Sequence, residues 1–127
     1  MEKLMEITPE MKTVVKEKAA QVEAEVKKNF DTLYSEWQKF RKTPALRFSG
    51  NPVDYCKNKS FDEITKMGSS VIPLLMEKMA EGDFFCLSAV DKIVKEEGLE
   101  RLKLSPEEMA NSEQNRSYYM VKHYNLI

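Results

Sequence analysis

Apolar or small side chains recur at every third or fourth position for thirty residues near the N-terminus. They are Met11, Val15, Ala19, Val22, Val26, Phe30, Leu33, Trp37 and Phe40. Steps of three and four follow one face of an α-helix, whereas a strand with one buried face alternates every second residue. Thr8 and Pro9 supply a helix start, and Pro44 disfavours helical geometry at Thr43. The pattern therefore predicts one long helix that packs by a single stripe.

The length of this predicted helix conflicts with the size of the chain. A straight helix over residues 9–43 would be about 50 Å long, whereas a compact chain of 127 residues has a diameter of about 36 Å. The helix must therefore either extend past the body or bend near Asn29. The second half of the stripe is aromatic and is expected to pack on the domain. The first half carries Val and Ala, and either protrudes towards a partner helix or folds inward.

Helix-start and helix-stop signals alternate along the remainder of the chain. Residues 44–59 hold two prolines and a Ser-Gly-Asn-Pro turn, which predicts a long connector. The start signals are Ser60 with Glu63, Ser70, Asp83, and Ser105 with Glu108, and the stop signals are Gly68, Gly82 and Gly98. They predict an all-α single domain over residues 1–127 with about five helices. Its parts are a long N-terminal helix within 1–43, the connector 44–59, and a helical hairpin with a C-terminal helix within 60–127.

Residues 61–90 read FDEITKMGSSVIPLLMEKMAEGDFFCLSAV, and their layout is set by Gly68, Pro73, Asp83 and Ala89. This layout resembles a unit of the HEAT-like helical repeat family. In that family a glycine-led turn and a proline open the first helix, an aspartate begins the tight turn, and a small alanine lets the second helix pack closely. The resemblance implies a rigid helical hairpin. A single unit predicts no extended array, because stacked repeats need at least about three copies to bury a continuous core.

The whole of residues 61–127 is also similar to a group of small uncharacterised bacterial and phage-associated helical proteins. In that group an aromatic pair begins the second helix of the hairpin, as Phe84 and Phe85 do here, and an aromatic helix ends the chain. The likeness implies a shape and no activity. Phe84 and Phe85 are either exposed anchors for a partner or core residues, and we expect at least one of them to pack in the core.

No constellation of residues in the sequence predicts catalysis. His123 is the only histidine, and the two cysteines, Cys56 and Cys86, stand thirty positions apart. Cys86 is surrounded by apolar neighbours, which favours a buried thiol over a nucleophile. The sequence lacks paired metal ligands and a glycine-rich phosphate loop. We therefore predict a protein that is not an enzyme and that has no catalytic, cofactor-binding or metal-binding residues.

Basic residues gather where the first helix meets the connector. Six bases stand between residues 39 and 59 against a single acid, although the net charge of the chain is −1. Lys39, Arg41, Lys42 and Arg47 alternate with aromatic residues, as in surfaces that bind single-stranded nucleic acid. Because the aromatic residues Trp37 and Phe40 already belong to the apolar stripe, these four cations alone are the candidate contacts for a nucleic acid or a partner.

Two functional hypotheses follow. The first is a small non-catalytic helical module for protein–protein interaction, with an unknown protein partner or a second copy bound through the N-terminal helix. The alternative is a nucleic-acid-associated, phage-related protein that uses the basic segment 39–59. The sequence contains no apolar run long enough for a membrane span and no signal-like segment, and two thiols are typical of a reducing compartment. A cytoplasmic protein without membrane contact is expected.

Overall fold

The computed structural model describes residues 3–44 and 52–127. These residues form seven α-helices and no strand, which confirms the all-α prediction. The α-helices are α1 (Pro9–Ala20), α2 (Ala24–Arg41), α4 (Lys59–Lys66), α5 (Ile72–Ala80), α6 (Cys86–Glu97), α7 (Pro106–Met109) and α8 (Glu113–Asn125). Three short 3-10 helices join them: η1 (Pro52–Cys56), η2 (Gly68–Val71) and η3 (Glu100–Leu102). The count exceeds five because the first and last of the predicted helices are each divided in two.

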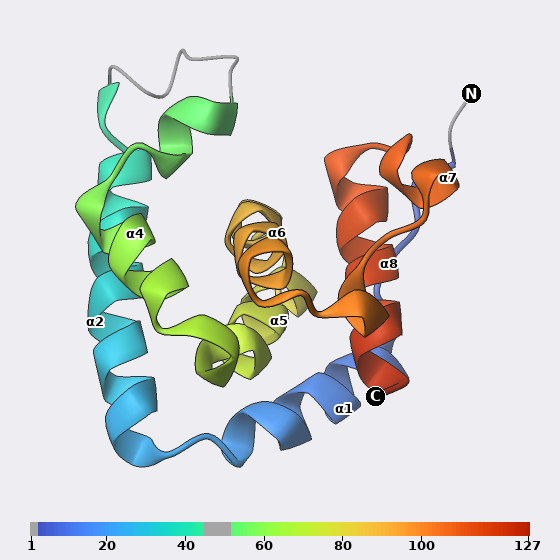
Figure 1. Cartoon of the computed structure of the whole chain (residues 1–127), viewed down its shortest axis with the longest axis horizontal. Coiled ribbons are helices and arrows are strands. Elements are labelled where there is room, and N and C mark those ends of the chain that lie inside the picture. The colour runs from blue at the N-terminus through green and yellow to red at the C-terminus, as the bar shows by residue number, and fades with distance from the viewer. Residues whose placement is uncertain (1–2, 45–51) are drawn as a thin grey trace.

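The hairpin of α5 and α6 lies at the centre of the molecule, as Figure 1 shows. Helices α2 and α4 pack together on one side of it, α8 packs on the other side, and α1 crosses beneath against α5 and α8. The core is therefore formed by the faces that these helices turn towards the hairpin. Its largest fully buried side chains are Trp37, Phe30, Ile64, Leu74, Leu75, Met76, Met79, Ile93, Met120, Val15, Val71 and Val90.

The prediction of one long N-terminal helix is wrong. The helix breaks at residues 21–23 and not near Asn29, and of the two alternatives for its first half the structure has the inward one, with both halves packed on the domain. Val15 and Ala19 on α1 are buried, as are Phe30 and Trp37 on α2, and the rest of the stripe is partly buried against the core. The break contains neither glycine nor proline. The break resolves the conflict between the length of a single helix and the diameter of the protein, because bending lets both halves of the stripe be buried away from water.

The helix caps show which local signals the chain uses. The capping box at Ser105 is confirmed: its hydroxyl accepts from the Glu108 N–H at 3.1 Å, and Glu108 accepts from the Ser105 N–H at 2.9 Å. It opens the four-residue helix α7, and α8 starts afresh behind the cap Ser112. The capping box at Ser60 is wrong. Asn58 caps α4 by accepting from the N–H groups of residues 60 and 61, and the Ser60 hydroxyl donates to Glu36 at 2.7 Å.

The hairpin turn depends on glycine. Gly82 has a φ of +106°, a region that favours glycine, and it reverses the chain between α5 and α6. Gly98 ends α6 in the left-handed conformation with a φ of +64°, as its sequence position predicts. Among the described residues, no helix combines the length and the apolar character that crossing a membrane requires.

Candidate functional site

An open hollow of about 630 Å³ lies where four parts of the fold meet. The end of α2 supplies one wall, the turn between α5 and α6 supplies another, and Tyr55 of η1 and Glu113 at the start of α8 complete the lining. The lining residues are Gln38, Arg41, Lys42, Tyr55, Gly82, Asp83, Phe84, Phe85 and Glu113. The hollow therefore joins segments that are far apart in the sequence.

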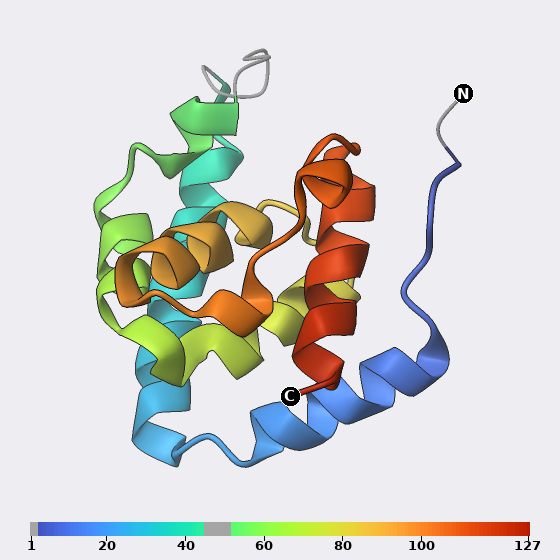
Figure 2. The same cartoon turned by 45° about the vertical axis from the view of Figure 1, so that its right-hand side comes forward.

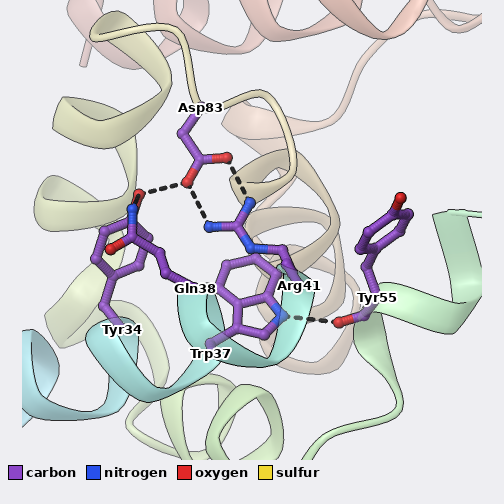
Figure 3. A network of polar contacts seen from close by, with 6 residues as sticks. All are labelled: Tyr34, Trp37, Gln38, Arg41, Tyr55 and Asp83. Atoms are coloured by element: carbon purple, nitrogen blue, oxygen red, sulfur yellow. Dashed lines mark hydrogen bonds and ion pairs between the residues drawn. The ribbon is translucent and has the colours of Figure 1, made fainter. Parts of the chain in front are cut away.

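A buried ion pair forms the floor of this hollow. Arg41 donates to both carboxylate oxygens of Asp83, with Nη1–Oδ1 and Nη2–Oδ2 distances of 2.7 and 2.8 Å (Figure 3). The two side chains are 9% and 16% exposed. The Tyr34 hydroxyl also donates to Asp83, and Gln38 donates to that hydroxyl at 3.2 Å. The network ties α2 to the hairpin turn at a bidentate, charge-assisted contact.

Aromatic rings enclose the guanidinium of this pair. The Arg41 Cζ atom lies 4.1 Å from the centroid of the Trp37 ring and 5.0 Å from that of Phe85. Trp37 in turn donates its indole N–H to the Tyr55 carbonyl at 2.7 Å (Figure 3). Cation–π contacts of this kind strengthen when water is excluded. Arg41 is thus held by Asp83 at its charged edge and is contacted by two aromatic rings.

Electrostatics fix the protonation states of the network. Burial alone would raise the pKa of Asp83, but the hydrogen bonds from Arg41 and Tyr34 outweigh it and lower that pKa. Burial, and then the hydrogen bond to Asp83, raise the pKa of the Tyr34 hydroxyl. At neutral pH the carboxylate stays ionised and the phenol stays protonated. Neither group is poised to exchange a proton near neutrality, as a general acid or base would be.

The four candidate contact residues have different surroundings. Lys39 and Lys42 are exposed at the end of α2, and Lys42 lines the hollow. Arg41 also lines it, but its charge is paired with Asp83. Arg47 lies outside the described residues, as does part of the segment 39–59. The sequence pattern did not place Asp83 in one site with Arg41. The two residues are 42 positions apart, and no local sequence signal predicts that they pair.

The thiols and the histidine occupy separate environments. Cys86 is fully buried in the core, and burial raises the pKa of its thiol well above the ordinary value. Burial also raises the pKa of Cys56. His123 on α8 lies 3.0 Å from a carboxylate oxygen of Glu108 on α7 and joins these two helices. Among the described residues, no cluster of three His, Cys, Asp or Glu side chains could hold a metal ion.

The two phenylalanines at the hairpin turn are both half-buried, but only Phe85 is packed against the hydrophobic core. Phe85 is partly buried against the core, as expected for at least one of the two rings, and its ring centroid lies 4.6 Å from that of Tyr55. Phe84 is half-buried and lines two hollows. The second hollow, of about 360 Å³, lies between the hairpin turn and residues 5–7 near the N-terminus. Phe84 therefore forms a ridge between two concave surfaces.

Comparisons with known proteins returned no match: no family model, no curated protein and no solved structure is significantly similar to the chain. The resemblance to HEAT-like repeats and to bacterial and phage-associated helical proteins stays a prediction from the sequence.

Proposed function

We propose that the protein is a non-catalytic helical module that binds another protein through the surface around Phe84. One observation carries the proposal: Arg41 and Asp83, the charged groups on the floor of the larger hollow, bind each other, and Phe84 remains a partly exposed ring between two hollows. Aromatic side chains that insert into or border a pocket are frequent anchors of protein interfaces. An enzyme would instead need reactive groups arranged around a substrate, whereas Arg41 and Asp83 on the floor of the hollow bind each other.

The surroundings of Phe84 favour a peptide or protein ligand. Lys42 and Glu113 border the larger hollow with opposite charges, and Gln38 adds an amide. A polar rim around an apolar centre is the usual organisation of protein interfaces. Cys56 and Cys86 carry thiols and not a disulfide, which favours a reducing compartment, so the proposal places the module in the cytoplasm.

Capture of partners from native cells tests this function. We expect the unmodified chain to retain a partner that Phe84→Asp loses, while circular dichroism and the unfolding midpoint stay unchanged. Met109→Asp is the matched control, because Met109 on α7 is 47% exposed and lies outside both hollows. Retention of the same proteins by all three chains would contradict the role of Phe84.

Self-association through the N-terminal helix needs a surface other than the apolar stripe. That stripe packs within the chain, with α1 against α5 and α8, and α2 against α4. A homodimer would have to use the exposed faces of α1 and α2, where charged residues dominate. Light scattering at micromolar concentration measures this state, and a monomer would remove self-association from the proposal.

A second candidate function is nucleic-acid binding through the end of α2. Lys39 and Lys42 are exposed there, whereas Arg41 is half-buried and paired with Asp83. Two phosphate contacts would give a salt slope of about −1.4 to −1.8 in a double-logarithmic plot and a weak affinity. Titration of labelled DNA and RNA at two salt concentrations, with Lys39→Glu/Lys42→Glu as the variant, tests it. Absence of binding at low salt would exclude this function.

A further inference from the structure

Residues 3–8 form an extended N-terminal arm that runs beside α8 before α1 begins (Figure 2). The arm has no regular secondary structure of its own. Its direction is the same as that of α8, since residue 115 near the start of α8 contacts the start of the arm and Asn125 contacts Met11 at 3.4 Å. The arm therefore lies along a surface formed by the start of α8 and the end of α5.

Two side-chain amides of α8 bind the backbone of the arm. Asn115 Oδ1 accepts from the Met5 N–H at 2.7 Å, and Asn115 Nδ2 donates to the Lys3 carbonyl at 2.8 Å. Gln114 Nε2 donates to the Met5 carbonyl at 3.2 Å. Asn115 is only 1% exposed. A carboxamide has the same donor and acceptor as a peptide group, so this pair recognises extended backbone whatever its side chains.

The side chains of the arm alternate between the surface of the protein and solvent. Met5 and Ile7 are half-buried, whereas Leu4 and Glu6 are exposed. This period of two is that of an extended strand with one face bound. Beside the two inward side chains lies the second hollow, of about 360 Å³, whose other walls include Met79, Ala80 and Phe84. The surface thus accepts apolar side chains at alternate positions and leaves space beside them.

The arm is held by side-chain hydrogen bonds from α8 and by the packing of Ile7 against the core. Three hydrogen bonds from residues 114 and 115 fix six extended residues, each of which loses conformational freedom on binding. Helix α1 is anchored independently, because Val15 and Ala19 are buried in the core. Release of the arm would therefore leave the rest of the fold intact and expose the amides.

We propose that this groove binds an extended segment of a partner protein, with apolar side chains at two alternate positions, and that the arm occupies the groove in cis until the partner displaces it. The inference rests on the proposed function and names the site and the class of partner. A partner segment is favoured over the arm of a second copy, because six residues reach at most about 20 Å. Two copies could exchange their arms only if the groove of each copy lay within about 20 Å of the start of α1 in the other. A segment of a separate partner protein has no such constraint.

A labelled synthetic peptide with the sequence of residues 3–9, KLMEITP, serves as the probe, and fluorescence polarisation reports its binding to the full chain. Met5→Glu/Ile7→Glu loosens the arm and leaves the groove unchanged. We expect this loosened chain to bind the probe at least tenfold more tightly than the unmodified chain, because the arm no longer competes. A probe with glutamate at the two apolar positions is the matched control and should not bind.

A second substitution tests the amides themselves. Adding Gln114→Glu to the loosened chain replaces a donor with an acceptor opposite a carbonyl, so probe affinity should fall at least tenfold. Gln114 is half-buried and tolerates this change better than the buried Asn115, for which Asn115→Ala is the companion variant. Hydrogen exchange of α8 amides confirms that each variant is folded.

Each result decides between the two proposals. Equal probe affinity for the unmodified and loosened chains, or no effect of Gln114→Glu, would overturn the groove. If the probe results overturn the groove but Phe84→Asp still abolishes capture of a partner, the proposed function holds and this inference fails. Probe binding without any such capture would overturn the function. A dimer that the arm substitutions dissociate would show that a second copy is the occupant and overturn the choice of partner.

Discussion

Replacing Asp83 with asparagine removes one charge from the floor of the larger hollow and changes the volume little. In the unmodified protein this carboxylate binds Arg41 through two hydrogen bonds and accepts a third from Tyr34. The variant would leave the Arg41 guanidinium, whose side chain is 9% exposed, without a counter-charge. The aromatic rings around it cannot replace solvent as partners for its N–H groups.

The expected cost follows from this burial. Removing one partner of a buried ion pair costs about 3–5 kcal/mol, and we take about 3 kcal/mol because asparagine keeps one acceptor oxygen. An unfolding entropy of about 2.1 cal/mol/K per residue, applied to 127 residues, gives about 0.27 kcal/mol/K. The midpoint of thermal unfolding should therefore fall by about 11 °C.

Urea unfolding followed by circular dichroism measures this loss for Asp83→Asn. Glu100→Gln is the control, since Glu100 pairs with Lys103 at 2.6 Å but the two side chains are 77% and 49% exposed, and its loss should stay below about 0.5 kcal/mol. The triple variant Arg41→Met/Asp83→Leu/Tyr34→Phe should regain most of the lost stability, because apolar side chains of similar size avoid the desolvation of charge. Equal losses for Asp83→Asn and Glu100→Gln would refute the reasoning.

The pH dependence of this loss has a definite sign. The pKa of Asp83 is lowered in the folded state, so the pair stabilises the protein above the ordinary pKa of 3.8 and loses that contribution as the pH falls through the folded value. The difference between the unmodified chain and Asp83→Asn should be full at pH 7 and shrink in acid. A difference that grows on acidification would contradict the assignment.

Three further results are expected. Burial raises the pKa of Asp91 to about 6, against the opposing effect of the Arg116 charge, so the free energy of unfolding should fall as the pH rises from 3.8 towards 6. Urea unfolding should therefore show that Asp91→Asn stabilises the chain at pH 7 by up to about 3 kcal/mol. Near pH 4 the same substitution should leave the stability unchanged. Burial alone would raise the pKa of Glu108, but the capping-box hydrogen bonds and His123 lower that pKa. At pH 7 the urea midpoint of Glu108→Gln should therefore lie below that of the unmodified chain. The two midpoints should approach each other as the pH falls below 4.5. Gly98→Ala should cost about 1 kcal/mol because φ is +64° there with open space around the added carbon, and thermal unfolding with no loss would contradict this.

The parts of the fold that the sequence predicts correctly rest on contacts within one or two helical turns. The apolar stripe from Met11 to Phe40 identifies the buried face even though the helix carrying it is broken. The capping box at Ser105 and the left-handed stop at Gly98 are likewise confirmed. Spacing of three or four residues and a single turn of backbone determine such features, so they can be read without knowing what lies opposite.

The candidate site could not be predicted in the same way. Arg41 was expected to face a ligand with the other cations, and the structure pairs it with Asp83, 42 positions away. The amide of Asn115 binds Met5 across 110 positions. The amino-acid sequence alone determined the helical class, the buried faces and several helix ends, because these depend on neighbours along the chain. Tertiary structure decided the bend after α1, the partner of Arg41 and the path of the arm, because charges and amides find partners only when distant elements lie side by side.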